Sequence, residues 1–342
     1  MRYTLFILLW AFCATVIGQN ADNKVNSNGK KQGFWKKYDE SGRLLYEGNF
    51  QNGVPVGQFK YYHTNGKLKS TTNFIQGTHK VYTVMYDESE KKAAEGIFVD
   101  QQKDSVWNYY NPKGTLIKTE SYKKGKRNGL WRTYSSQTGI LLEECTYLDD
   151  KLNGSFKTFY ADGKISGRID YINGQMNGTV EAYFPNEKIY YRGTYLEGLQ
   201  IKNWDYYDES GRKRKTLEYN HGVLQKTYLY LKMAGAIQQF NQADIAYFHK
   251  EGNSTRVTLK SGKSFLSAEI FDELLTVLDF VDFCLINPQY AVSYPCIIKY
   301  REIDSDSIEV VLYPQTAEPV ICEGDHAKSV KMLFNNEIPK EE

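Results

Sequence analysis

Aromatic residues return along most of this chain at a fixed interval, with polar and glycine-rich segments between them. The segment from Lys124 to Tyr134, KGKRNGLWRTY, has counterparts on both sides, and successive copies are 24 residues apart except for one step of 25. Self-similarity at this period is typical of a repeat array in which one supersecondary unit stacks on the next. We therefore expect an array followed by a further domain.

Three positions recur in every copy and are named here as rows. The ring row is Trp35, Phe59, Thr83, Trp107, Trp131, Phe156, Val180 and Trp204. The tyrosine row is Tyr38, Tyr62, Tyr86, Tyr110, Tyr134, Phe159, Tyr183 and Tyr207. The flanking row is Phe50, Phe74, Phe98, Tyr122, Tyr147, Tyr171, Tyr195 and Tyr219.

Each copy has the sequence pattern of a β-hairpin. In the first copy, the aromatic run 34–38 favours an extended chain, the segment 39–42 supplies turn residues, and 44–50 alternates between two faces. A hairpin of this size cannot bury a core alone and must pack on its neighbours. Trp131 and Tyr134 are three residues apart and should point to opposite faces, so we expect a buried ring row and a more open tyrosine row.

Two copies depart from the pattern. In the third, Thr83 replaces the tryptophan, Glu90 the turn glycine and Gln101 the linking glycine. In the seventh, Val180 and Glu187 replace the aromatic residue and the glycine. These copies either tolerate the changes or mark a break with a functional purpose.

These residues resemble a known family. The segment 46–53, YEGNFQNG, is similar to the core of MORN repeats, and 191–198 repeats its first part. The stretch from Gly129 to Gly139 resembles the bacterial MORN variant repeat, which is also found in antitoxin-like proteins. The resemblance covers about residues 29–222 and implies a ladder of β-hairpins. In that family, function ranges from membrane association to protein scaffolding.

The fold class predicted is mainly β, with an elongated single-sheet array of about eight hairpins at 29–222 and a small α+β domain at 241–342. Residues 223–240 are either a degenerate ninth repeat or a cap for the exposed edge. Beyond them we expect hairpins at 255–265 and 297–313, a helix over 267–283 with Ser267 as its N-cap, and short strands at 320–322 and 330–334.

The N-terminus predicts export. Arg2 precedes an apolar run over 3–17, and we expect a signal peptide at 1–18 and a flexible lead-in at 19–28. The protein would then be periplasmic, secreted or associated with the cell surface. An exported location permits a disulfide among Cys284, Cys296 and Cys322, but the sequence does not pair them. Cys145 reads as a small buried hydrophobic residue.

Charge is uneven along the chain. Residues 24–222 carry 31 Lys and Arg against 23 Asp and Glu, whereas 223–342 carry 11 against 17. No catalytic or cofactor motif is present in the sequence, and the five histidines lack metal-ligand spacing. We therefore expect no enzyme activity, no cofactor and no metal, and nucleic acid is a poor candidate for a partner.

The hypothesis favoured by the sequence is a non-enzymatic binding or scaffold protein whose hairpin surface contacts another protein. The rivals are an antitoxin-like immunity protein and a binder of envelope glycan or anionic lipid. The predicted contact residues are members of the tyrosine row: Tyr62, Tyr86, Tyr110, Tyr134, Tyr183 and Tyr207.

Overall fold

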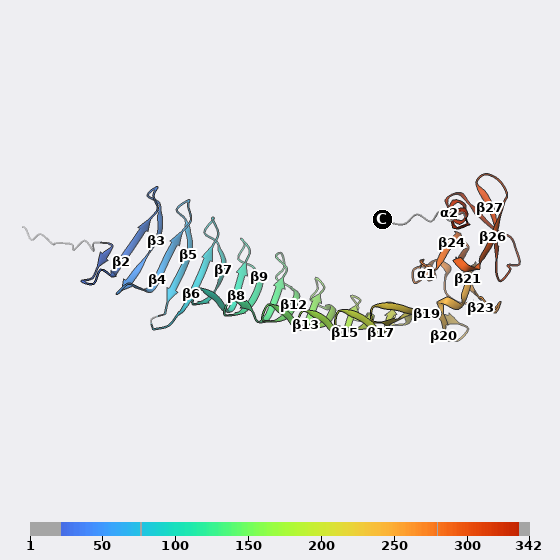
Figure 1. Cartoon of the computed structure of the whole chain (residues 1–342), viewed down its shortest axis with the longest axis horizontal. Coiled ribbons are helices and arrows are strands. Elements are labelled where there is room, and N and C mark those ends of the chain that lie inside the picture. Colours follow the sequence, from blue (N-terminus) through green and yellow to red (C-terminus); the bar gives the residue numbers. More distant parts are fainter. Residues whose placement is uncertain (1–21, 76, 279, 335–342) are drawn as a thin grey trace, which may run out of the picture. The chain divides into compact units, whose positions relative to one another are not determined.

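The computed structural model describes residues 22–75, 77–278 and 280–334, so the predicted signal peptide lies outside the described residues. The chain divides into two compact units. The first runs to Gly129 and includes 136–139, and the second comprises 130–135 and everything from Ile140 onward. Strands β1 to β20 belong to a 20-stranded antiparallel sheet of hairpins, as the repeat period predicted (Figure 1).

The first unit consists of consecutive hairpins, each pairing with the next. Its strands are β1 (Lys24–Val25), β2 (Lys31–Tyr38), β3 (Leu44–Gln51), β4 (Val54–Tyr62), β5 (Leu68–Phe74), β6 (Lys80–Tyr86), β7 (Lys92–Val99), β8 (Gln102–Tyr110), β9 (Leu116–Lys123) and β10 (Lys126–Arg127).

The second unit begins with hairpins of the same kind. Their strands are β11 (Gly129–Tyr134), β12 (Leu141–Leu148), β13 (Lys151–Phe159), β14 (Ile165–Ile172), β15 (Gln175–Tyr183), β16 (Ile189–Leu196), β17 (Leu199–Tyr207), β18 (Lys213–Asn220), β19 (Val223–Met233) and β20 (Ala236–Asn241).

The turns keep their shape where glycine is replaced. Glu90, Gln101 and Glu187 adopt φ values of 63°, 63° and 66°, in the left-handed region that glycine occupies in the other copies. The turn geometry is therefore imposed by the flanking strands, and the two atypical copies remain hairpins.

Five of the eight ring-row residues are buried, as the pattern predicted, whereas Trp35, Trp131 and Phe156 are half-buried. Trp107 and Phe59 are fully buried, and Trp204 is nearly so. Each of these three rings lies over a glycine eleven residues earlier in the chain. A Cβ added to Gly96 would lie 2.3 Å from the Trp107 ring, and one added to Gly193 would lie 2.2 Å from the Trp204 ring. The glycine thus provides the space that the ring occupies.

The two atypical copies replace this glycine and ring by two residues of middle size. Thr72 is paired directly with Thr83, and Ile169 with Val180. The hydroxyl oxygens of the two buried threonines are 3.1 Å apart, within hydrogen-bond distance. The departures are therefore matched by changes on the neighbouring strand, which preserves the sheet in both copies.

The C-terminal domain contains two further sheets and two helices. Its elements are η1 (Gln242–Asp244), β21 (Ile245–Glu251), β22 (Ser254–Leu259), β23 (Ser264–Ser267), α1 (Phe271–Leu275), β24 (Phe283–Asn287), β25 (Tyr290–Ser293), η2 (Tyr294–Cys296), β26 (Ile297–Glu302), β27 (Ser307–Leu312), β28 (Val320–Glu323) and α2 (Gly324–Phe334).

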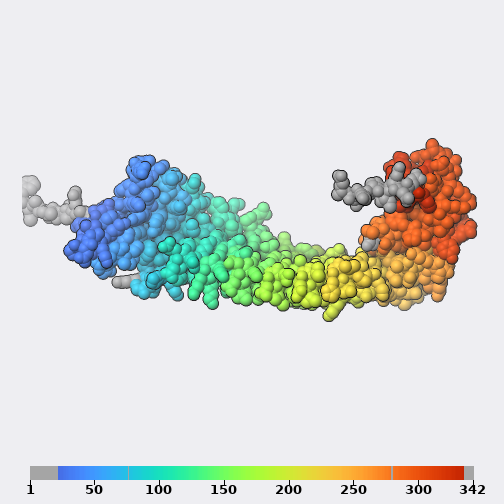
Figure 2. Space-filling model, viewed as in Figure 1, coloured from blue at the N-terminus to red at the C-terminus, as the bar shows by residue number. Residues whose placement is uncertain are grey.

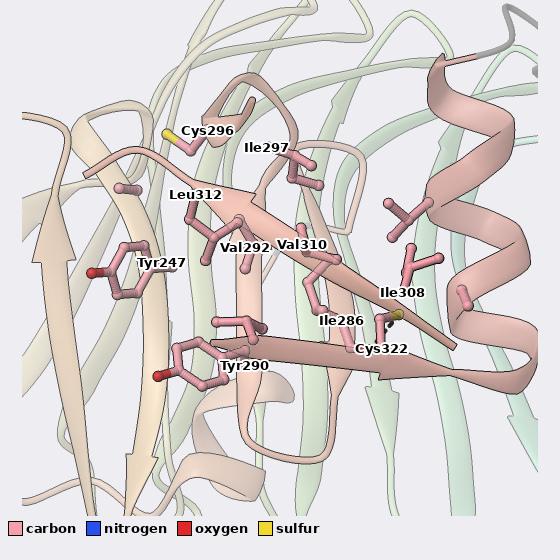
Figure 3. Close-up of a cluster of buried hydrophobic side chains, with 14 residues drawn as sticks. Tyr247, Ile286, Tyr290, Val292, Cys296, Ile297, Ile308, Val310, Leu312 and Cys322 are labelled. Carbon is pink, nitrogen blue, oxygen red and sulfur yellow. Dashed lines mark hydrogen bonds between the residues drawn. The ribbon is translucent and has the colours of Figure 1, made fainter. Parts of the chain in front are cut away.

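Two buried clusters hold this domain together. One cluster joins both sheets to helix α2 and includes Ile286, Val292, Ile308 and Val310 (Figure 3). The other joins Leu229 and further residues of the β19–β20 hairpin to the domain. That hairpin therefore shares a core with the C-terminal domain, which the space-filling view shows as a closely filled orange to red body (Figure 2).

A buried ion cluster also links the last typical hairpin turn to this domain. The Arg212 guanidinium donates two hydrogen bonds to the Glu269 carboxylate, which also accepts one from the Lys232 backbone N–H at 3.0 Å. The Arg214 guanidinium lies 3.5 Å from the same carboxylate. Since Glu269 is almost fully buried, removing one arginine would leave its charge poorly compensated.

Two secondary-structure predictions were wrong. The helix expected over 267–283 is only α1, because Ser267 belongs to the edge strand β23 and its hydroxyl donates to the Lys232 carbonyl, 3.0 Å away. The expected strand over 330–334 is the end of helix α2, where Ala327 and Val330 face the core three residues apart.

Candidate binding surface

The tyrosine row lies on the side of the sheet opposite the ring row. Trp35 faces Gly48 across β2 and β3, whereas the next residue, Lys36, faces Glu47. Glu47 in turn faces Lys60 on β4 and accepts a hydrogen bond from the Tyr62 hydroxyl at 2.7 Å. Because side chains alternate along a strand, these charged residues and the tyrosines share one side, named here the polar face.

Carboxylates of the polar face pair with cations on the same strand or on a neighbouring one. In the first unit, Glu95 accepts hydrogen bonds from the Tyr110 and Tyr82 hydroxyls and pairs with Lys92 at 2.9 Å. Burial alone would raise the pKa of Glu95, but these three donors hold it at about 2. The carboxylate is thus ionised and fully engaged within the protein.

The second unit repeats this arrangement with arginines. Arg168 and Arg192 both contact Glu181, at 2.7 and 2.9 Å, and the Tyr183 hydroxyl donates to the same carboxylate. Burial raises the pKa of Tyr183, and its hydrogen bond to Glu181 adds to that effect. A second set of the same kind centres on Glu144, which is bound by a lysine and an arginine.

Acids and bases on this face differ in exposure. The Glu181 side chain is 6% exposed and that of Glu144 20%, whereas Arg168 and Arg192 are 51% and 49% exposed. Each carboxylate therefore lies beneath the surface, while its cationic partners project into solvent. A macromolecule that approaches this face would meet guanidinium and ammonium groups together with tyrosine rings.

All six predicted contact tyrosines are half-buried on the polar face. The hydroxyls of Tyr62, Tyr110 and Tyr183 donate to carboxylates of the same face. Tyr134 interacts with Arg132 and raises the pKa of this guanidinium, though less than Glu144 does. The last two are Tyr86, whose carbonyl oxygen is contacted by His63 Nε2 at 3.1 Å, and Tyr207, whose ring lies 5.9 Å from Lys213 Nζ.

Sequence reasoning missed the charged residues that accompany these tyrosines. The signal was present, because Glu47 and Glu95 are 48 residues apart, and Glu144 follows after 49 more. The lysine partners of Glu47 and Glu144 recur with the same period at Lys60 and Lys157, allowing for the insertion. The period was assigned to aromatic residues and glycines alone, so this cross-strand row was not recognised.

The other side chains considered from the sequence do not gather into a reactive site. Within the described ranges, no group of three His, Cys, Asp or Glu residues could hold a metal ion. Cys145, Cys284, Cys296 and Cys322 are free thiols in the structure. Burial raises the pKa of Cys284 to about 12, so this thiol is protonated at neutral pH. Across the part of the chain that is described, neither helix is long and apolar enough to cross a membrane.

The structure thus defines an array of β-hairpin repeats with one ring-bearing side and one polar side. The MORN repeat variant matches this chain at residues 31–52, 55–76, 152–173 and 176–197. These matches lie in both units and coincide with the hairpins. The chain is a MORN-repeat protein.

Comparisons with other proteins add little to this assignment. No curated protein sequence matches the chain. A LytTr DNA-binding domain of a methyl-accepting/DNA response regulator from Bacillus cereus aligns with 13% identity and a TM-score of 0.27, over 31% of this chain and 95% of its own. TarM aligns with 11% identity and a TM-score of 0.22, over 28% of this chain and 19% of TarM.

The Tc holotoxin pore of Photorhabdus luminescens aligns with 11% identity and a TM-score of 0.17, over 67% of this chain and 16% of that chain. Likenesses at this level carry no conclusion about fold or function.

Proposed function

We propose that this protein is a non-enzymatic, exported bacterial binding protein whose polar face contacts an acidic surface of another protein. The observation that supports this proposal is the sorting of charge on that face. Its carboxylates are held under the surface by tyrosine hydroxyls, and its lysines and arginines extend outward. Such a surface attracts anionic groups and repels cationic ones.

The residue types of the polar face suit a protein partner. Tyrosine and arginine are enriched at protein interfaces, where a ring supplies contact area and a guanidinium supplies several directed donors. Both recur on the face at the interval of the repeats, so a unit can offer several similar contacts to one extended partner. Each hairpin contributes a weak contact, and several together provide avidity.

Capture from an envelope extract tests the proposal. The purified protein is compared with a Tyr86→Ser, Tyr207→Ser variant, since neither hydroxyl takes part in the carboxylate bonds described above. Loss of two interface rings should weaken capture by about 1 kcal/mol or more. Tyr313→Ser serves as the control, because Tyr313 is 61% exposed in the C-terminal domain.

A thermal melt of each variant separates binding from folding. Weaker capture with an unchanged melting temperature would support the polar face as the binding surface. Capture that is identical for all three proteins would contradict it. Parallel assays with anionic vesicles and with envelope glycans test the two rival ligands, and a captured toxin would favour the antitoxin-like role.

A further inference from the structure

The third repeat lacks the ring that its neighbours place between two rings of the flanking row. In the second repeat, Phe59 packs edge to face against Phe50 and Phe74, with ring centroids 5.2 and 5.0 Å apart. In the fourth, Trp107 packs in the same way against Phe98 at 4.7 Å. Thr83 occupies the equivalent place between Phe74 and Phe98, so each of these rings keeps its edge-to-face neighbour in the adjoining repeat and has no ring beside it at Thr83.

The side chain that covers the ring in the first and fourth repeats has a counterpart here that is turned away. The residue four positions before the ring is Lys31 in the first repeat and Lys103 in the fourth, and each ammonium lies over its tryptophan at 4.7 and 4.8 Å. In the third repeat this residue is His79. Its ring extends into solvent, 82% exposed, and its Nδ1 lies 2.6 Å from an Asp100 carboxylate oxygen.

Strands β5 and β6 pair without the bulge that separates β7 from β8 in register. Pairing of β5 with β6 runs without a register shift from Ser70–Met85 to Phe74–Val81, whereas β7 and β8 are offset by a bulge beside Trp107. In the third repeat the Thr72–Thr83 pair takes the place of the glycine and ring. Two buried hydroxyl groups therefore lie where a ring would otherwise stand.

These three features coincide with a groove of about 1010 Å³ in the first unit. Its lining includes Phe74, Phe98, Met85, Thr72 and Thr83. This part of the lining is aromatic and apolar apart from the two threonine hydroxyls, and polar and charged residues, among them Lys69, His79 and Asp100, complete it. An aromatic side chain fits this lining better than a charged group, because burying a charge there would leave it without a counter-ion.

The unit that contains the groove is basic. Residues 22–129 carry 19 Lys and Arg against 11 Asp and Glu, a net charge of +8. At the rim, Asp100 is engaged by His79, whereas Lys69 is exposed and has no carboxylate partner among the described residues. The groove therefore favours an aromatic residue that is flanked by acidic ones.

We propose that this groove binds an aromatic side chain on an acidic, extended segment of another protein, with the ring completing the ring row between Phe74 and Phe98. Contacts to both flanking rings would be edge to face, as in the second repeat. Most of the named lining lies on the ring-bearing side, and of the six polar-face tyrosines only Tyr62 also lines the groove. Neither Tyr86 nor Tyr207 lines it, so the two binding surfaces are tested by different variants.

A pair of labelled peptides tests the proposal. Each is a short chain of glycine, serine and glutamate, with a central phenylalanine in one and alanine in the other, and binding to the full chain is followed by fluorescence anisotropy. Burial of the ring predicts that the phenylalanine peptide binds about tenfold tighter or more. Equal affinity of the two peptides would overturn the proposal, as would equal binding of a version with lysine in place of glutamate.

A variant that fills the groove from within provides the second arm. Thr72→Gly with Thr83→Phe copies the glycine and ring of the second repeat and should abolish the preference for phenylalanine. The matched control is Ile169→Gly with Val180→Phe, which makes the same change in the seventh repeat and should leave the preference unchanged. Unaltered preference in the first variant would refute the assignment to this groove.

The variant Lys69→Glu provides a separate test in case the groove-filling variant does not fold. Lys69 is an exposed rim residue, so its replacement should leave the melting temperature unchanged. We expect it to weaken binding of the acidic phenylalanine peptide about threefold or more, because attraction becomes repulsion. Unchanged affinity for that peptide would contradict the charge component of the proposal.

Discussion

Replacement of a ring and its facing glycine by two β-branched residues should reveal how the repeats are packed. Trp204 lies on Gly193, and the same two positions of the preceding repeat hold Val180 and Ile169. The natural chain thus fills the same space in at least two ways. One is a large ring that packs on a glycine, and another is a pair of β-branched residues that lie side by side. The variants Gly193→Ile, Trp204→Val and their combination convert the first solution into the second.

The expected magnitudes follow from the geometry. Trp204 is 4% exposed, so its replacement by valine leaves a cavity and should cost about 2–4 kcal/mol. In Gly193→Ile, even the first added carbon would lie 2.2 Å from the ring, and overpacking should cost about 1–3 kcal/mol. The double variant restores a matched pair, so its loss should be about 2 kcal/mol smaller than the sum of the single losses.

Native-state hydrogen exchange of the β16 and β17 amides is the appropriate assay, because long repeat arrays need not unfold as a single cooperative unit. Urea unfolding provides the global comparison. If the three losses add within about 0.5 kcal/mol, the two residues do not compete for one space and the packing argument is refuted.

Two further predictions concern individual groups. The donors to Glu95, including Tyr110, lower the pKa of this carboxyl from its usual 4.5 to about 2. The ionised carboxylate should therefore stabilise the fold fully above pH 4.5, and this contribution should be lost as the pH falls from 4.5 toward 2. Unfolding measured across this range should therefore show a smaller pH dependence in Glu95→Gln. Trp107 donates its indole N–H to the Ile97 carbonyl at 3.0 Å, whereas no partner for the Trp204 indole nitrogen lies in the described part of the chain. Replacement by phenylalanine should thus cost about 1 kcal/mol more at Trp107 than at Trp204, and equal losses would show that this bond contributes nothing.

The repeated hairpins could be predicted because each copy has the same local sequence pattern. Rings, turn residues and alternation of faces recur at one interval, so a copy that departs from the pattern can still be assigned from the others. The pairing of Thr72 with Thr83 was harder to see, although the spacing of eleven residues between Gly96 and Trp107 contains the information. To predict this pair, one must know which residues face each other across neighbouring strands.

The C-terminal domain has no repeated sequence pattern against which a secondary-structure prediction could be checked. Its apolar residues at helical spacing, including Leu274 and Val281, predicted a long helix, yet Val281 is 83% exposed and lies after the helix has ended. Tertiary pairing of β23 determined where the helix could begin. The absence of a ring at Thr83 could be read from the sequence, but the groove could not, since it also depends on the direction in which His79 turns.

Photo-crosslinking from the polar face tests the central proposal most directly. A benzophenone amino acid is placed at Tyr86 in one protein and at Tyr313 in another, and each is irradiated in the envelope extract. The proposed function predicts that an acidic protein is linked through residue 86 and not through residue 313. Linkage through residue 313 alone, or the same products from both positions, would contradict binding by the hairpin array.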